Sequence, residues 1–381
     1  MSFEEALIKE DLFQSSIVSY IDEIERVEKI IVWGSGGAAK NYIKFLNKFN
    51  LENKIIFIAD NNSRLWGTTY KKYIIKNIDN VLEYVTQYPD TRVVVASQSL
   101  AAIKRQLISK GIRDNKVDTL GYGLVKDYWT FSEFTPYQII KRDWNSYKST
   151  YESLADEFSK KVYIGILNSK ISLNNKYLNN ISSKSEEQYF APDIIELEEN
   201  EVFCDCGSFH GDTLDVFIKH TKGVYEKYLA FEADPTNFYA LLNNINEKGY
   251  KNVDAYKLGC WDKKDSLKFS PNLTAGKLMG DGEITINVDA LDNIVQTPLT
   301  FLKMDIEGAE EKALIGAKDI IKKHQPILAI CLYHSLEDYG KLPTLIREFD
   351  SNYTFYIRHY TELVDAETVC YAIPKHRLIT K

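Results

Sequence analysis

A glycine-rich stretch in the second half of the chain, EVFCDCGSFHGDT at residues 201–213, combines residue types that can bind a ligand. Gly207 and Gly211 permit tight turns and a close approach of the backbone to a bound group. The helix predicted to begin at Asp212 and Thr213 offers unpaired N–H groups to a carboxylate or another anion. The stretch therefore predicts a backbone turn that holds an anionic ligand.

The two cysteines of this stretch, Cys204 and Cys206, raise the alternative of a metal site. Two thiolates flanking one residue cannot complete a tetrahedral zinc site, and no other Cys or His pair has the usual spacing. In a strand both side chains point to the same side. We therefore expect them to pack in the core, and we assign no metal ligand.

Further candidate residues follow the next predicted strands. Glu232 lies about twenty residues after the turn, where an acidic side chain can accept hydrogen bonds from both hydroxyls of a ribose. Residues 258–261 (LGCW), which include Gly259, Cys260 and Trp261, end a third strand predicted at 253–261 and are placed to line an adenine. Asp305 and Glu307 end a fourth strand, and Tyr333 and His334 end a fifth. All lie where open α/β sheets bind ligands, which predicts a nucleoside pocket.

Two blocks of alternating strands and helices position these residues, and they predict an α/β fold of two Rossmann-like domains. We expect a nucleotide-binding type of domain at 1–125, a helical connector at 126–199 and a second domain at 200–381. The last two predicted strands, 353–360 and 368–374, are joined by a short link, which indicates an antiparallel edge hairpin on a seven-stranded sheet. Residues 262–294 predict an inserted hairpin over the pocket.

Composition limits the function. The net charge of −7 is unfavourable for nucleic-acid binding, which needs dense Lys and Arg. We see no signal peptide and no apolar stretch of the roughly 20 residues that span a bilayer. The five scattered cysteines suit a reducing compartment, so we expect a cytoplasmic protein, with a homo-oligomer left open.

Several separate blocks resemble one known family. VFCDCGSFHGDT, AFEADP, LKMDIEGAE, LAICLYHSLEDYGKLP, YIRHY and ETVCYAIP occur in order between about Val162 and Pro374. They are similar to the FkbM family of S-adenosylmethionine-dependent methyltransferases, which have the class I fold. The resemblance implies S-adenosylmethionine as the cofactor and O-methylation of a sugar or polyketide, often in surface-polysaccharide pathways.

The resemblance also implies roles for residues. Asp205, Gly207 and Gly211 would contact the amino-acid part of the cofactor, and Glu232 would hold its ribose. We expect the full set of cofactor contacts at Asp205, Gly207, Ser208, Gly211, Asp212, Thr213, Glu232, Ala233, Asp234, Gly259, Cys260, Trp261 and Asp305.

Transfer of a methyl group to a hydroxyl needs an aligned acceptor and a base for its proton. His334 is our first choice as the base, because histidine titrates near neutrality, with Asp305 and Glu307 as the other catalytic candidates. The two carboxylates alternatively orient the acceptor or, with His334, hold a divalent ion, for which oxygen ligands favour magnesium over zinc. The cluster of residues 358–360 (RHY) either touches the acceptor or belongs to a half-buried edge strand.

The first block has a glycine pattern of its own. Gly34, Gly36 and Ala39 fit G-x-G-x-x-A, and Asp60 ends the next strand, as in a nucleotide site. Residues 55–70 (IIFIADNNSRLWGTTY) look like the nucleotide-sugar-binding domains of some surface-glycan enzymes. The block either binds the nucleotide of an activated sugar or serves only for packing or oligomerisation.

These observations together predict an S-adenosylmethionine-dependent O-methyltransferase that acts on a carbohydrate or nucleotide-sugar acceptor. An NAD-dependent sugar oxidoreductase or epimerase that uses the first glycine turn is a second hypothesis, although the Tyr-x-x-x-Lys pair of short-chain enzymes is missing beside that turn. A third hypothesis is a nucleotide-sensing scaffold without turnover.

Overall fold

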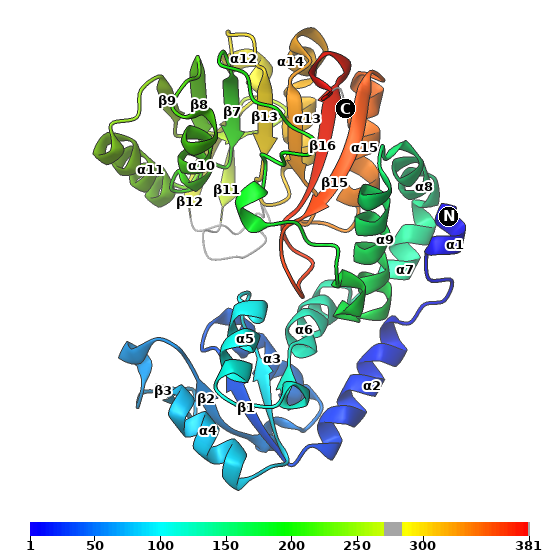
Figure 1. The fold of residues 1–381 in the computed structure, drawn as a ribbon, viewed down its shortest axis with the longest axis vertical. Helices are drawn as coiled ribbons and strands as arrows, with labels where there is room; N and C mark the ends of the chain where they lie inside the picture. Colours follow the sequence, from blue (N-terminus) through cyan, green and yellow to red (C-terminus); the bar gives the residue numbers. More distant parts are fainter. Residues whose placement is uncertain (270–283, 380–381) are drawn as a thin grey trace. The chain divides into compact units, whose positions relative to one another are not determined.

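The computed structural model describes residues 1–269 and 284–379, which form two compact α/β units (Figure 1). Each unit is built from separate stretches of the chain. The first unit comprises Met1–Arg142, Ile164–Asn180 and Thr361–Asp365. The second unit comprises Asp143–Tyr163, Ile181–Tyr360 and Ala366–Lys381. The compact units differ from the division expected at residues 125 and 199, because the segment 126–199 contributes to both.

A six-stranded sheet with the order β3-β4-β2-β1-β5-β6 organises the first unit. All neighbouring strands are parallel except the short hairpin of β3 and β4. The sequence predicts β1, β2 and β5 from their apolar runs, whereas the other strands have only two to four residues and carry little pattern. The strands are β1 (Lys29–Trp33), β2 (Ile55–Ala59), β3 (Thr69–Tyr70), β4 (Tyr73–Lys76), β5 (Thr91–Val95) and β6 (Val117–Asp118).

Helices complete the first unit and cover apolar clusters on its sheet. They are α1 (Phe3–Ala6), α2 (Phe13–Arg26), α3 (Gly37–Lys48), α4 (Ile78–Gln87), α5 (Leu100–Ser109), α6 (Leu120–Thr130) and α7 (Pro136–Arg142). α9 (Glu157–Ser172) has residues in both units. No helix in the described ranges combines the length and the apolar character that crossing a membrane requires.

A seven-stranded sheet with the order β15-β16-β14-β13-β7-β8-β9 organises the second unit (Figure 1). β16 is antiparallel to both of its neighbours, and the other strand pairs are parallel. The predicted seven-stranded sheet with an antiparallel edge hairpin is therefore confirmed. The strands are β7 (Val202–Cys206), β8 (Lys227–Phe231), β9 (Val253–Tyr256), β13 (Phe301–Met304), β14 (Ile327–Cys331), β15 (Tyr353–His359) and β16 (Thr368–Pro374).

The core of this second sheet is rich in aromatic rings. Phe203 stacks on Tyr228 and Phe301, which come from the two strands beside β7. The helices of the unit follow its strands. They are α8 (Trp144–Ser153), α10 (Asp212–Thr221), α11 (Pro235–Lys248), α12 (Leu291–Ile294), α13 (Glu310–Ile315), α14 (Lys318–His324) and α15 (Asp338–Phe349).

The region predicted as one long third strand, residues 253–261, is two strands in different sheets. β9 belongs to the main sheet, whereas β10 (Gly259–Cys260) pairs with β12 (Ile284–Asp289) in a three-stranded sheet. β12 also pairs with β11 (Asp265–Phe269) in the antiparallel manner expected for the inserted hairpin. The predicted tip of that hairpin, and its place over a pocket, involve residues 270–283, which lie outside the described residues.

Two helical regions of the second unit have a local irregularity. The stretch 310–324 is divided into two helices at Gly316, which lies against another segment; a Cβ on it would be 1.9 Å from the carbonyl oxygen of Trp261. α15 begins at Asp338 and contains Pro343. A proline removes the hydrogen bond to the carbonyl four residues earlier. That carbonyl, of Tyr339, instead accepts a hydrogen bond from the hydroxyl of Tyr163 at 3.1 Å.

Candidate active site

The glycine turn after β7 presses its backbone against the neighbouring strand β13. Gly207 has φ +84°, and a Cβ placed on it would lie 1.9 Å from the carbonyl oxygen of Asp305, so only glycine fits. The N–H groups of Gly207 and Ser208 both donate to the carbonyl of Phe231 at the end of β8. The turn is thus fixed on both sides, as the sequence predicts for a close backbone approach.

The turn ends at α10, whose first turn points its amide groups toward the same region. Gly211 precedes the helix with φ +88°, and no side chain caps this end. Asp212 is exposed and Thr213 is buried. An uncapped helix N-terminus can attract an anion, and the role of the turn in binding one stays a prediction.

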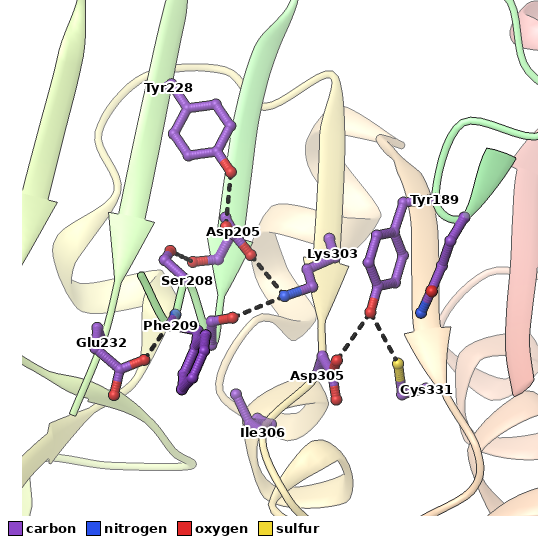
Figure 2. A network of polar contacts seen from close by, with 12 residues as sticks. Tyr189, Asp205, Ser208, Phe209, Tyr228, Glu232, Lys303, Asp305, Ile306 and Cys331 are labelled. Atoms are coloured by element: carbon purple, nitrogen blue, oxygen red, sulfur yellow. Dashed lines mark hydrogen bonds and ion pairs between the residues drawn. The ribbon is translucent and has the colours of Figure 1, made fainter. Parts of the chain in front are cut away.

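Beside the turn lies a buried ion pair that the sequence analysis missed (Figure 2). Lys303 Nζ lies 2.8 Å from Asp205 Oδ1 and donates to the carbonyl oxygen of Gly207 at 2.8 Å. Oδ2 of Asp205 accepts from the hydroxyl of Tyr228 at 2.6 Å. Asp205 has no exposed area. The expected cofactor contact of Asp205 therefore needs correction: its carboxylate is used internally, to brace the turn through Lys303.

Ser208 has a similar internal role. Its side chain is fully buried, and its hydroxyl donates to the carbonyl of Asp205 at 3.0 Å. The bond therefore joins the turn to the end of β7. The expectation that the Ser208 side chain contacts a ligand is therefore not supported by its surroundings in this structure.

Glu232 lies at the end of β8, beside the turn. Its carboxylate accepts from the N–H of Phe209 at 2.9 Å and from the N–H of Asp234 at 2.8 Å. Burial raises the pKa of Glu232 to about 6, against the opposing effect of these hydrogen bonds. A carboxylate with two fixed donors keeps free lone pairs for further hydroxyl groups, so its geometry suits a ribose.

The residues around Glu232 divide into surface and structural positions. Ala233 is partly exposed, whereas Asp234 caps α11, accepting from the backbone N–H groups of Thr236 and Asn237. The capping role accounts for an aspartate at position 234 without a ligand. We therefore correct the expected cofactor contact of this side chain.

The three residues expected near an adenine have different environments. Gly259 lies beside Ala233, since a Cβ on it would be 3.4 Å from the Cβ of that residue. Cys260 is 4% exposed, so its side chain belongs to the interior. Trp261 is partly exposed, and its ring lies under the ammonium group of Lys312 at 5.9 Å. Of the three, Gly259 and Trp261 keep surface that a base could contact.

Asp305, the residue after β13, carries a carboxylate held by two phenols. Oδ2 accepts from the hydroxyl of Tyr189 at 2.8 Å and Oδ1 from the hydroxyl of Tyr333 at 3.0 Å. Burial raises its pKa, but Lys303 and His334 outweigh burial and hold the pKa of Asp305 below its usual value. The side chain keeps 21% of its area exposed. Asp305 is therefore an ionised carboxylate that a ligand can reach.

His334 joins this carboxylate to two glutamates. Its Nε2 lies 3.4 Å from Asp305 Oδ1 and 3.7 Å from Glu307 Oε2. Its Nδ1 lies 2.9 Å from Glu310 Oε1. Burial lowers the pKa of this imidazole, but the carboxylates, with Glu310 first, outweigh burial and raise it to about 9. The three residues that the sequence predicts as catalytic are thus brought together, and Glu310 joins them.

The raised pKa changes the expected role of His334. A histidine with a pKa of about 9 carries its proton at neutral pH and cannot accept another. The expectation that His334 titrates near neutrality, and so serves as the base, is therefore corrected. Three carboxylates around one buried imidazole are the physical cause.

The cluster of residues 358–360 is structural rather than a contact for an acceptor. Arg358 is 2% exposed and pairs with Asp156 and Asp193 at 2.7 and 2.6 Å. The next two residues, a histidine and a tyrosine, are also buried and bond to side chains of β16. Of the two readings left open, the buried edge strand is the one observed.

Some of the missed residues left a signal in the sequence. Lys303 stands in an otherwise apolar strand, and the strand register places it opposite Asp205. A buried lysine facing a buried aspartate predicts an ion pair once β7 and β13 are assigned as neighbours. Tyr189 comes from the segment before β7, where no local pattern places it near Asp305. Glu310 begins a helix, where a glutamate is common, so the sequence alone did not indicate that it contacts His334.

The glycine turn of the first unit has a comparable backbone. Gly34 has φ +110°, and a Cβ on it would lie 2.6 Å from the carbonyl oxygen of Ala96. Gly36 is exposed and precedes α3 without a side-chain cap. Asp60, at the end of β2, accepts from the backbone N–H and the hydroxyl of Ser35 at 3.0 and 2.6 Å. The predicted residues are thus brought together at one edge of this sheet.

Comparison with known proteins characterises part of the second unit. Residues 205–357 match the family model of the methyltransferase FkbM domain. This part of the chain is similar to FkbM methyltransferase domains. Residues 26–118 match the model of a C2185-like N-terminal domain. The likeness of the first unit to nucleotide-sugar-binding domains stays a prediction. A search of curated proteins found no match.

Solved structures show the fold of the whole chain. The structure of methyltransferase FkbM from Methylobacillus flagellatus has a TM-score of 0.67 and 21% identity, covering 94% of this chain and 98% of that chain. An rRNA methylase from Streptococcus thermophilus has a TM-score of 0.32 and 14% identity, over 47% of this chain and 89% of that one. Aeropyrum pernix fibrillarin with bound S-adenosyl-L-methionine has a TM-score of 0.30 and 13% identity, over 47% and 70%.

S-adenosylmethionine is the cofactor of this methyltransferase domain. The residues present fit it. The backbone at Gly207 approaches the end of β13 more closely than any side chain would allow. A Cβ on Gly211 would lie 2.8 Å from Asn244 Nδ2. Both glycines therefore let the turn pack closely against its neighbours. The uncapped start of α10 suits the cofactor's carboxylate, and Glu232 suits its ribose.

Proposed function

We propose that the methyltransferase domain transfers a methyl group from S-adenosylmethionine to the hydroxyl of a sugar. The observation that carries this proposal is the carboxylate of Asp305. It is partly exposed, it follows β13 directly beside the Gly207 turn, and the hydroxyls of Tyr189 and Tyr333 hold both its oxygens. Such a group can accept the hydrogen of a neutral hydroxyl acceptor.

The chain's own residues account for the alignment that methyl transfer needs. When bound, S-adenosylmethionine supplies an electrophilic methyl group on a sulfonium. The glycine turn and Glu232 orient the donor, and the Asp305 carboxylate takes the proton of the hydroxyl as the oxygen–carbon bond forms. Fixed positions replace the freedom of two separate reactants, which is a large part of catalysis in such displacements.

A sugar is favoured as the acceptor because the rim of this region is polar and acidic. Glu307 is 53% exposed beside Asp305. Burial raises the pKa of the Glu367 carboxyl, and the negative charge of nearby Asp305 raises it further. Carboxylates are the side chains that accept hydrogen bonds from several hydroxyls at once. A polyol meets this demand better than an apolar acceptor does.

The test is a transfer assay with S-adenosylmethionine labelled on its methyl group. The purified chain is incubated with a panel of nucleotide sugars, free sugars and surface glycans from matched cells, and the labelled product is analysed by mass spectrometry. We expect an O-methylated sugar that is lost with Asp305→Asn and kept with Glu311→Gln, an exposed neighbour that pairs with Lys341. Methylation of nitrogen or carbon only would contradict the proposal.

We also propose that the first unit binds the nucleotide part of an activated sugar. The close approach of Gly34 to β5 and the position of Asp60 at the end of β2 support this role. Calorimetric titration of a uridine or guanosine diphosphate sugar tests it. We expect binding that weakens with Asp60→Ala and is unaffected by Glu232→Ala; binding of NAD instead would favour the oxidoreductase hypothesis.

A further inference from the structure

Three carboxylates surround the buried imidazole of His334. The side chain is 4% exposed. Its Nε2 faces Asp305 Oδ1 at 3.4 Å and Glu307 Oε2 at 3.7 Å, whereas Nδ1 faces Glu310 Oε1 at 2.9 Å. The arrangement places acidic groups on both sides of one ring. Asp305, Glu310 and His334 each offer a ligand atom within 4.8 Å of the others.

An independent observation is the lack of hydrogen bonds at these buried atoms. Nε2 of His334 has no hydrogen bond of good geometry among the described residues, and Oε2 of Glu310 has none either, whereas Nδ1 faces Oε1 of Glu310. Glu310 has no exposed area. Buried polar atoms without partners are costly, by about 1 to 3 kcal/mol each. Such a group at the edge of a binding region indicates a ligand that completes it.

We propose that Asp305, Glu307 and His334 bind one divalent cation and that Glu310 positions His334. Two ligand atoms bound to one cation at about 2.1 Å lie roughly 3 to 3.5 Å apart. The distances from Nε2 to Asp305 and Glu307 are close to that range.

Glu310 is a positioning residue because it faces the other ring nitrogen. A carboxylate next to Nδ1 keeps the proton there and leaves the lone pair on Nε2, directed at Asp305 and Glu307. Its second bond, from the N–H of Ile306 to Oε1 at 2.8 Å, ties the carboxylate to the loop after β13. This loop also carries Glu307, so one side chain fixes two parts of the site.

The ligand set selects the class of cation. One imidazole and two carboxylates suit manganese, and the carboxylates alone suit magnesium. No cysteine belongs to the described cluster, which makes a thiolate-rich zinc site a poor fit. With three protein ligands the cation would retain positions for other oxygens. The proposal deepens the proposed function and rests on it in one respect. The free coordination positions of the cation would bind the hydroxyl oxygens of the acceptor.

The test uses Mn²⁺ as the probe, because unbound Mn²⁺ gives an electron paramagnetic resonance signal that decreases on binding. The full chain is titrated and compared with Glu307→Gln, His334→Gln, Glu310→Gln and the control Glu311→Gln. Glu307 is half exposed, so its substitution does not threaten folding. We expect one Mn²⁺ per chain, an affinity at least tenfold weaker in Glu307→Gln and His334→Gln, and no change in Glu311→Gln.

Glu310→Gln separates positioning from folding. It keeps the shape of the side chain but removes its charge, so we expect weaker Mn²⁺ binding with an unchanged melting temperature. Competition by Mg²⁺ for the same site would support the assignment.

Two results would overturn the proposal. One is the absence of bound Mn²⁺ at millimolar concentration, and the other is equal binding in all variants, which would mean adventitious cations on an acidic surface. Titration of S-adenosylhomocysteine in the same samples keeps this result apart from the proposed function. If that ligand binds and methyl transfer proceeds without a cation, only the cation site is wrong; if Mn²⁺ binds as predicted but no hydroxyl is methylated, the proposed function is wrong.

Discussion

The two glycine turns of the chain share one backbone arrangement. In the first unit, Gly34 donates its N–H to the carbonyl of Ala59 and faces the carbonyl of Ala96. In the second, Gly207 donates to Phe231 and faces the carbonyl of Asp305. An acidic residue follows the neighbouring strand in both cases, Asp60 after β2 and Glu232 after β8. The turns therefore arise from the same strand order and the same need for a residue without a Cβ.

The side chains at matching positions differ in charge. Two residues before the glycine, Val32 pairs in register with Val94 in the first unit, whereas Asp205 pairs with Lys303 in the second. The residue after the strand that the turn faces is Ala96, after β5, in one unit and Asp305, after β13, in the other. The comparison teaches that one backbone arrangement can form both turns, while buried charges and an accessible carboxylate distinguish the turn of the second unit.

The largest expected effect comes from the closest backbone approach. Gly207→Ala places a Cβ against the carbonyl of Asp305 in a left-handed conformation, so we expect a loss of more than about 4 kcal/mol in the free energy of unfolding, and of cofactor binding. Gly36→Ala is the control, because a Cβ there meets nothing within 4 Å. Denaturant unfolding measures both. Equal stability of the two variants would show that the strand contact is misplaced.

The buried ion pair gives the next effect. Lys303→Met leaves the carboxylate of Asp205 buried without its cation, which costs about 3 to 5 kcal/mol. Val94→Met, at the matching place in the first unit, changes only an apolar contact and is expected to cost about 1 to 3 kcal/mol. The double variant Asp205→Leu with Lys303→Met should recover part of the loss. If Lys303→Met lowered the free energy of unfolding no more than Val94→Met does, the buried ion pair would not distinguish the stability of the two units.

Asp305→Asn tests the difference between the residue that follows β13 and the one that follows β5. The amide keeps the shape of the side chain but accepts a proton poorly, so we expect the methyl-transfer rate to fall about 10²- to 10⁴-fold. The affinity for S-adenosylhomocysteine, measured on the same variant, shows whether Asp305 also contacts the cofactor, as the sequence predicts. Ala96→Ser, the matching change in the first unit, should leave the rate unaltered. A rate unchanged by Asp305→Asn would remove this carboxylate from the chemistry.

The smallest expected effect is a pH dependence of cofactor binding. Burial raises the pKa of Glu232 to about 6, so the carboxylate that accepts the ribose hydrogens is ionised above that pH and protonated below it. Affinity for S-adenosylhomocysteine should therefore fall as the pH decreases through 6. Glu232→Gln should bind more weakly and lose this dependence between pH 5 and 7. Binding by the parent that is equally tight at pH 5 and pH 7 would count against the role of Glu232.

Much of the second unit follows from local sequence pattern. Apolar runs that end in Gly207, Glu232, Asp305 and His334 predict parallel strands with their functional residues at one edge, and the short link after His359 predicts the antiparallel hairpin. The glycine requirement was also predictable, because tight turns leave few other residues.

The rest depends on which segments meet in space. Residues 259–260 pair with β12 in a separate sheet, a choice made by a partner strand far along the chain. Tyr189 reaches Asp305 from a segment that has no strand or helix pattern of its own. The pKa of His334 is set by three carboxylates from one loop and one helix that follow a different strand, so its ordinary value was a poor guide. Burial and neighbours decide such roles, and neither is visible in spacing.

The central claim is tested most directly by calorimetric titration of S-adenosylhomocysteine. The purified chain is compared with its Glu232→Ala and Asp60→Ala variants. The two substitutions remove the matching acidic residues of the two glycine turns. We predict binding of one ligand per chain to the parent, binding weakened at least tenfold by Glu232→Ala, and binding unchanged by Asp60→Ala. Absence of binding to the parent, or a loss caused by Asp60→Ala alone, would contradict a cofactor site at residues 207–232.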